Sequence, residues 1–273
     1  MSAGSRFGQR TLVGLALASA RVPNRISRAT RAVLNALWLG VLSDEGLRAL
    51  DERYYDGADL YRSTGWNERG LFDWERRMVD EHLEPGARVG VAACGGGREV
   101  LALLEAGFDA VGHEPHPGLA AYGAEFLAAR GHPGRIEASP RDSLPEGAGP
   151  YAALIVGWGA YSLMHGRERR LGFLRATRAV LPAEAPVLIS FFDRPADTRE
   201  LRWTKAGANA LRRLRRRAPL ELGDTLAPNL VHVFLRSEFE GEVRAGGFEP
   251  AAYELVDTVD DTTRYACAIV RAA

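Results

Sequence analysis

The sequence Arg-Val-Gly-Val-Ala-Ala-Cys-Gly-Gly-Gly-Arg-Glu-Val occupies residues 88–100 and decides the fold. Its apolar first half predicts a short strand that is covered on both faces. The apolar positions Val100, Leu101 and Leu104 predict a helix that begins directly after the glycines. Glycines at such a turn let the backbone approach a ligand, and the first N–H groups of the helix point towards it. The stretch therefore predicts a strand–turn–helix cradle for a cofactor.

The next predicted strand, residues 110–114, ends on an acidic residue, Glu114. A carboxylate at the tip of the second strand of such a unit can accept hydrogen bonds from both hydroxyls of a ribose. The dinucleotide fingerprint G-x-G-x-x-G is not met, because Val100 stands where the third glycine is required. The pattern thus favours a nucleoside-containing cofactor other than a nicotinamide dinucleotide.

Strand-like and helical segments alternate through the rest of the chain, which is typical of a parallel sheet with right-handed crossovers. The last two strands are joined by a link that is too short for a crossover, so they must be antiparallel. We therefore expect an α/β fold, a Rossmann-like three-layer sandwich whose seven-stranded, mostly parallel sheet has an antiparallel last strand. The predicted strands cover residues 88–94, 110–114, 135–138, 151–157, 186–192, 248–256 and 265–271.

Composition excludes several classes of function. The 273 residues include 46% hydrophobic residues, which is enough for a sizeable core, and 35 basic residues balance 35 acidic ones. Zero net charge argues against a nucleic-acid coat protein, and two cysteines cannot form a disulfide framework. The only lysine, Lys205, lies in Thr-Lys-Ala, which excludes a Walker-type phosphate loop. No metal site is expected, because His113 and His116 lack a third ligand.

Residues 85–192 resemble the class I S-adenosylmethionine-dependent methyltransferases. Residues 88–100 look like the first motif of that family, residues 110–117 like the second, and residues 139–145 occupy the place of the adenine-contacting loop. The resemblance extends over residues 67–273 and implies a domain that binds S-adenosylmethionine. Its cofactor-binding residues would be Ala93, Cys94, Gly95, Gly97, Glu114, Pro115, Ser139, Arg141, Gly157 and Trp158.

Three residues depart from the family's pattern. Val91 replaces an acid that usually orders the cradle, Ala93 replaces the first motif glycine, and Pro140 stands where an Asp often meets adenine. Glu99 is a candidate to replace the missing acid, and Ala93 is expected to keep a negative φ. These departures leave open a non-catalytic protein, either a cofactor-binding pseudoenzyme or a scaffold recruited to a membrane. A nicotinamide-dependent oxidoreductase is a further alternative.

The resemblance implies in-line transfer of a methyl group to a small-molecule acceptor. The donor is already activated, so the protein mainly aligns the reactants and a general base is optional. The candidate catalytic residues are His165, His232 and Tyr161. Aromatic side chains suit a flat or apolar acceptor, and the candidate acceptor-binding residues are Tyr55, Tyr61, Trp66 and Tyr161. The same aromatic residues could instead attach the N-terminal segment to the domain.

Residues 1–66 are expected to form a helical lid or cap. Residues 1–43 contain six arginines and no acid, and Ile26–Leu42 has apolar residues at helical spacing. This pattern permits a lid or weak contact with a membrane surface, while Ala18–Ala20 would suit cleavage of a signal peptide. The basic stretch 198–218 is expected to be a solvated helix end, with a phosphate-bearing or membrane-surface partner as the alternative. The expected location is the cytoplasm, without nucleic-acid partners, and the sequence does not indicate an oligomeric state.

Overall fold

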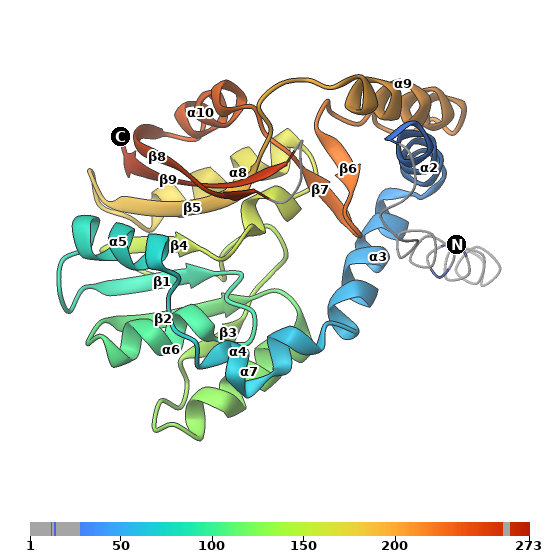
Figure 1. Ribbon diagram of the computed structural model, residues 1–273. Coiled ribbons are helices and arrows are strands. Elements are labelled where there is room, and N and C mark those ends of the chain that lie inside the picture. The colour runs from blue at the N-terminus through green and yellow to red at the C-terminus, as the bar shows by residue number, and fades with distance from the viewer. Residues whose placement is uncertain (1–11, 13, 15–27, 259–262) are drawn as a thin grey trace. The chain divides into compact units, whose positions relative to one another are not determined.

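The computed structural model describes residues 12, 14, 28–258 and 263–273, and the chain forms two compact units (Figure 1). The first, here called the sheet unit, consists of Ala58–Asp193 and Arg236–Ala273. The second, here called the helical unit, consists of Arg194–Leu235 and the described part of Met1–Gly57. The chain therefore leaves the sheet unit after its fifth strand and returns to it before its last helix.

The sheet unit contains a seven-stranded sheet in the order β3-β2-β1-β4-β5-β9-β8. Strands β1 to β5 pair in parallel, whereas β9 is antiparallel to both β5 and β8. This confirms the expected Rossmann-like sheet with its reversed last strand. The strands are β1 (Arg88–Ala92), β2 (Asp109–Glu114), β3 (Ile136–Ala138), β4 (Ala153–Val156), β5 (Pro186–Asp193), β8 (Phe248–Thr258) and β9 (Arg264–Ala272).

Helices flank this sheet, and their apolar side chains pack against it to complete the core. Helix α6 packs along β2, α7 along β3 and α10 along β8. Val89 and Val91 of β1 are fully buried, so the position of the missing family acid lies within the apolar core. The helices of this unit are η1 (Asp59–Arg62), α4 (Thr64–Asn67), α5 (Asp73–His82), α6 (Arg98–Glu105), α7 (Pro117–Ala128), η2 (Ala160–Leu163), α8 (Arg167–Ala179) and α10 (Arg236–Ala245).

The helical unit pairs the N-terminal helices with the insertion that follows β5. It contains α2 (Arg28–Val41), α3 (Asp44–Asp56), α9 (Arg199–Leu214) and a hairpin of β6 (Asp224–Leu226) and β7 (Leu230–His232). Its apolar core includes Leu39, Leu42, Leu47, Leu50, Ala208 and Leu230. Buried Arg212 attaches α9 to the N-terminal helices by donating to the Leu39 carbonyl (3.2 Å) and to Asp44 Oδ1 (2.6 Å).

This division differs from the expected boundary between residues 66 and 67. Residues 194–235 were expected within the sheet-bearing domain, but they cluster with α2 and α3. The reason is that α9 packs against α2, and its Ala208 lies in the apolar core of the helical unit. Conversely, residues 58–66 belong to the sheet unit.

The expectations for the beginning of the chain fall mostly outside the described residues. These include the signal-peptide pattern at Ala18–Ala20 and the first part of the predicted helix Ile26–Leu42. Within the described residues, no helix has both the length and the apolar character that crossing a bilayer requires.

Candidate functional site

The turn between β1 and α6 forms the expected glycine cradle. Gly95 and Gly97 have φ angles of 57° and 99°, which favour glycine, and the Gly97 amide donates to the Cys94 carbonyl (3.0 Å). The Cys94 side chain is buried, and a Cβ on Gly112 of β2 would lie 2.6 Å from its sulfur. Burial raises the pKa of this thiol well above its usual range, so Cys94 contributes backbone and packing to the cradle.

The structure corrects the expectation that Ala93 keeps a negative φ. Its φ is 53°, in the left-handed region, because the chain must reverse immediately after β1 whatever residue stands there. A Cβ in this conformation costs roughly 1–2 kcal/mol. The alanine is thus accommodated with local backbone strain.

We expect Ala93→Gly to raise the free energy of unfolding by about 0.5–1 kcal/mol. Glycine relieves roughly 1–2 kcal/mol of left-handed strain in the folded chain. This gain exceeds the about 0.4–1 kcal/mol of stability that is lost because glycine gives the unfolded chain more conformational freedom. Urea denaturation measures the difference. The matched control is Ala92→Gly within β1, which we expect to be destabilising because Ala92 is buried in an extended strand.

Glu114 connects the end of β2 to the cradle. Its side chain is buried, with Oε2 accepting from the Gly95 amide (2.7 Å) and Oε1 from the His116 amide (2.8 Å). Burial raises the pKa of this carboxyl to about 7, although the two amides and the charge of Arg141 oppose the rise. Each oxygen retains a lone pair, so the carboxylate can accept two further hydrogen bonds.

The loop after β4 lies against the cradle. A Cβ on Gly157 would be 2.3 Å from the Ala93 carbonyl oxygen, so only glycine permits this approach. Ser190 of β5 fixes the loop, because its hydroxyl accepts from the Gly159 amide (2.8 Å) and donates to the Gly157 carbonyl (3.2 Å). Ser190 was not predicted from the sequence, although a hydroxyl between the apolar residues of β5 is a visible signal.

Half-buried aromatic side chains gather beside this loop and form what we call the aromatic cluster. Trp158 lies 5.4 Å from Trp66, 5.8 Å from Phe72 and 5.3 Å from Tyr265, measured between ring centroids. Tyr61 lies 6.3 Å from Trp66. The structure therefore brings the predicted residues Tyr61, Trp66 and Trp158 together. Phe72 and Tyr265 were missed, because only the fold brings them to Trp158.

The segment that carries Tyr61 also covers the cradle. A Cβ on Gly96 would lie 2.1 Å from the Tyr61 carbonyl oxygen and 2.8 Å from both polar atoms of the Asn67 amide. Asn67 Nδ2 donates to the carbonyls of Tyr61 and Ser63, each at 3.0 Å. Its Oδ1 is buried, and no partner for it occurs among the described residues. Asn67 is thus an acceptor beside the glycines that the sequence analysis did not assign.

A buried ion cluster supports the first turn of α6. Both terminal nitrogens of Arg98 donate to Glu75 (2.6 and 2.7 Å), and one of them also donates to Glu99 Oε1 (2.7 Å). Arg98 also donates to the Gly70 carbonyl (2.9 Å), which ties residues 70–75 to the cradle. Glu99 therefore pairs with Arg98, and the expectation that it replaces the missing acid at Val91 gains no support from these contacts.

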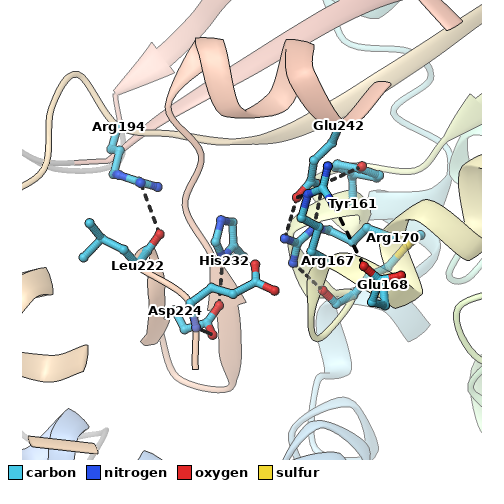
Figure 2. Close-up of polar contacts among 11 residues, drawn as sticks. Tyr161, Arg167, Glu168, Arg170, Arg194, Leu222, Asp224, His232 and Glu242 are labelled. Carbon is cyan, nitrogen blue, oxygen red and sulfur yellow. Dashed lines mark hydrogen bonds and ion pairs between the residues drawn. The ribbon is translucent and has the colours of Figure 1, made fainter. Parts of the chain in front are cut away.

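Tyr161 is not placed to contact an acceptor, which corrects the sequence-based assignment. The residue is fully buried, and its hydroxyl donates to Glu242 Oε2 at 3.0 Å (Figure 2). Arg170 donates to both oxygens of the same carboxylate, at 2.8 Å each. Burial, and then the charge of Glu242, raise the pKa of Tyr161 well above its usual range. This side chain joins η2, α8 and α10.

The other predicted residues are distributed over both units. Tyr55 is half-buried in α3 of the helical unit, and His165 is half-buried after η2 of the sheet unit. His232 of the helical unit is buried, with Nδ1 2.7 Å from Asp224 Oδ1 across the β6–β7 pair (Figure 2). The ligand atoms of His232, Asp224 and Glu221 lie within 4.8 Å of one another, a spacing that could admit a metal ion.

The two histidines around Glu114 have structural contacts. His113 Nε2 lies 2.6 Å from the Tyr151 hydroxyl, and burial lowers the pKa of the imidazole despite the opposing charge of Glu137. His116 Nδ1 accepts from the Leu119 amide (3.2 Å) and so caps α7. Both roles agree with the packing function that the sequence suggested.

No family model matches the sequence, and a search of curated proteins found no match. Solved structures are similar in fold. A SAM-dependent methyltransferase from Methanosarcina mazei matches with a TM-score of 0.59 and 14% identity, over 74% of this chain and 98% of its own. The 1,6-didemethyltoxoflavin-N1-methyltransferase from Burkholderia thailandensis matches with a TM-score of 0.59 and 16% identity, over 85% and 92% of the two chains.

A third solved structure shares the fold but has a different activity. The cyclase SpnF matches with a TM-score of 0.53 and 14% identity, over 75% of this chain and 83% of its own. One fold thus supports a cyclase as well as methyltransferases. The chain has the fold of the SAM-dependent methyltransferases, as its motifs at residues 88–100 and 110–117 indicated.

Proposed function

We propose that the chain binds S-adenosylmethionine in the glycine cradle and transfers its methyl group to a small-molecule acceptor. The observation that carries the proposal is the buried carboxylate of Glu114, which ends β2 and is held against the Gly95 amide. At this point of the fold, the two oxygens of a carboxylate can accept hydrogen bonds from the two hydroxyls of a ribose. Methyltransferases of the same fold, among them the 1,6-didemethyltoxoflavin-N1-methyltransferase and an amino pentose methyltransferase, support the class of reaction.

The residues around the cradle fit this cofactor. Helix α6 begins at Arg98 directly after the glycines, and the N-terminus of a helix favours an anionic carboxylate. Asn67 Oδ1 would accept from a donor such as the ammonium group of the methionine part. Arg141 acts on Glu114 electrostatically, and the Ser139 amide donates to the Glu114 carbonyl (3.1 Å), so both lie on the nucleoside side. Pro115, Gly157 and Trp158 complete the proposed site.

The bound cofactor would supply a methyl group that is already activated as a sulfonium. The chain's own residues then have to orient the acceptor and exclude water. The aromatic cluster of Tyr61, Trp66, Phe72, Trp158 and Tyr265 suits these tasks because it presents flat apolar faces beside the Gly157–Gly159 loop. We therefore infer a flat or apolar acceptor. Within the sheet unit, His165 remains the candidate general base.

Isothermal titration of the full chain tests the cofactor. We expect S-adenosylmethionine and S-adenosylhomocysteine to bind and NAD to show no heat of binding. Incubation with methyl-labelled cofactor and a small-metabolite extract then tests transfer. Binding of NAD in place of S-adenosylmethionine would contradict the assignment, whereas cofactor binding without any labelled product would identify a pseudoenzyme.

Cofactor affinity should rise with pH until Glu114 is ionised. Burial raises the pKa of this carboxyl to about 7, so the protonated form dominates below that value. The ionised form accepts hydrogen bonds on both oxygens, so affinity should increase up to about tenfold per pH unit below about pH 7 and level off above it. Titrations between pH 5.5 and pH 8.5, in buffers of different ionisation enthalpy, measure both the affinity and the proton released. A flat profile would show that Glu114 does not hold the ribose.

A further inference from the structure

Helices α2 and α9 pack against each other (Figure 1), and their contacts through small residues show that they run in the same direction. A Cβ on Gly207 would lie 3.0 Å from Ala36 Cβ, and a Cβ on Gly40 would lie 2.7 Å from Leu211 Cβ. These contacts, which advance together along both helices, identify the row of each helix that faces the other. Apart from Leu211, the residues in these contacts are small, and four larger apolar side chains of the two helices lie outside the contact and are exposed.

These four exposed side chains lie on one side of the helix pair. Successive residues of an α-helix are rotated by about 100° around its axis. Val33 and Leu37 each come one residue after a residue of α2 that contacts α9, so they lie beside the contact row. Trp203 and Ala210 lie one step before contacting residues of α9, and Leu214 lies one turn after Ala210. The two helices are parallel and face each other. A residue one position after the contact row on α2 and a residue one position before the contact row on α9 therefore lie on the same side of the helix pair.

The resulting surface, here called the α2–α9 face, is strongly exposed. The exposed fractions are 66% for Val33, 43% for Leu37, 57% for Trp203 and 81% for Leu214. Among the described residues, these are four of the six large hydrophobic side chains that are exposed. Scattered single hydrophobic residues are normal on a protein surface, but a cluster on one face indicates an interaction site.

Exposed positive charge lies on α9 and in the residues directly after it. Arg199, Arg202, Arg213, Arg215 and Arg216 are exposed, and none of them forms an ion pair with another described residue. Glu200, the acidic residue of α9, is already bonded to Arg31 of α2 (3.0 Å). The face therefore combines apolar side chains, a tryptophan and uncompensated arginines, which is the composition of helices that lie in a membrane interface.

We propose that the α2–α9 face docks on the surface of an anionic lipid bilayer. Trp203 and Leu214 enter the boundary between headgroups and acyl chains, and the exposed arginines contact lipid phosphates. A second copy of the chain is less suited to this face, because a two-fold contact would bring the arginines of both copies together. Nucleic acid would use the arginines but would leave the apolar side chains in water.

Vesicle flotation of the full chain tests the proposal. We expect binding to phosphatidylcholine vesicles that contain phosphatidylglycerol and little binding to phosphatidylcholine alone. Raising the salt from about 0.1 M to about 1 M should release much of the protein, since the screening length falls from roughly 10 Å to 3 Å. Arg213→Gln/Arg215→Gln/Arg216→Gln should weaken binding roughly a hundredfold.

Apolar insertion is tested by Trp203→Gln/Leu214→Gln, which should abolish flotation at any salt concentration. The matched control is Leu255→Gln on β8 of the sheet unit, an exposed leucine outside the face, which should bind vesicles like the unchanged protein. Circular dichroism confirms that each variant is folded. Sedimentation without lipid measures the oligomeric state.

Two results would overturn the proposal. The first is flotation that is absent, or that is equal for the Trp203→Gln/Leu214→Gln variant and the unchanged chain. The second is a dimer in lipid-free buffer that the same two substitutions dissociate, because the face would then be an interface between copies. Neither result bears on cofactor binding, so the test is independent of the proposed methyl transfer.

Discussion

Replacing Arg98 by Met is expected to lower the free energy of unfolding by about 3–5 kcal/mol. Arg98 is 2% exposed and neutralises Glu75 and Glu99, which are themselves buried. Burial, and the charge of Glu99, already raise the pKa of Glu75, while Arg98 opposes the rise. Without the guanidinium, two neighbouring carboxylates remain in the core with no cation between them.

Denaturation by urea measures this loss, and its pH dependence identifies the cause. Uncompensated carboxylates have raised pKa values in the folded state, so the variant's deficit should be smaller at pH 5 than at pH 8. The control is Arg77→Met, which removes an ion pair with Glu254 whose partners are 52% and 36% exposed. Such a pair contributes at most about 1 kcal/mol. Equal losses for both variants would show that the Arg98 cluster is not a special support of the cradle.

Glu114→Ala is expected to weaken binding of S-adenosylmethionine about 10- to 150-fold. The estimate follows from the roughly 1.5–3 kcal/mol that hydrogen bonds to a charged group contribute. The substitution also releases the Gly95 amide, which the carboxylate now holds at 2.7 Å, so the cradle loses one of its supports.

Calorimetric titration at pH 8, where the carboxyl is ionised, measures the loss. Glu114→Gln separates charge from shape, because the amide keeps one acceptor and should have an intermediate affinity that no longer varies with pH. Glu125→Ala, an exposed residue of α7, is the control and should leave affinity unchanged. If folded Glu114→Ala binds the cofactor as tightly as the unchanged chain, the ribose site lies elsewhere.

Local sequence determined the glycine cradle and the acidic residue beside it. The apolar run before Gly95, the helical spacing after it and the acid that ends β2 are all short-range patterns. The structure places Glu114 against Gly95 as that spacing requires. The parallel sheet and its reversed last strand followed in the same way, from the alternation of elements and from one short link. Such features are predictable because side-chain periodicity and turn geometry depend on neighbouring residues.

Tertiary structure alone decided which side chains are available for chemistry. Tyr161 follows the fourth strand as an acceptor-contacting residue would, yet Glu242, 81 residues away, takes its hydroxyl into a buried network. Asn67 and Ser190 gained their places at the site from segments far along the chain. Residues 194–235 joined the N-terminal helices because α2 offers α9 an apolar and closely fitting partner. Burial and partnership depend on distant segments, and no local pattern encodes which of them will meet.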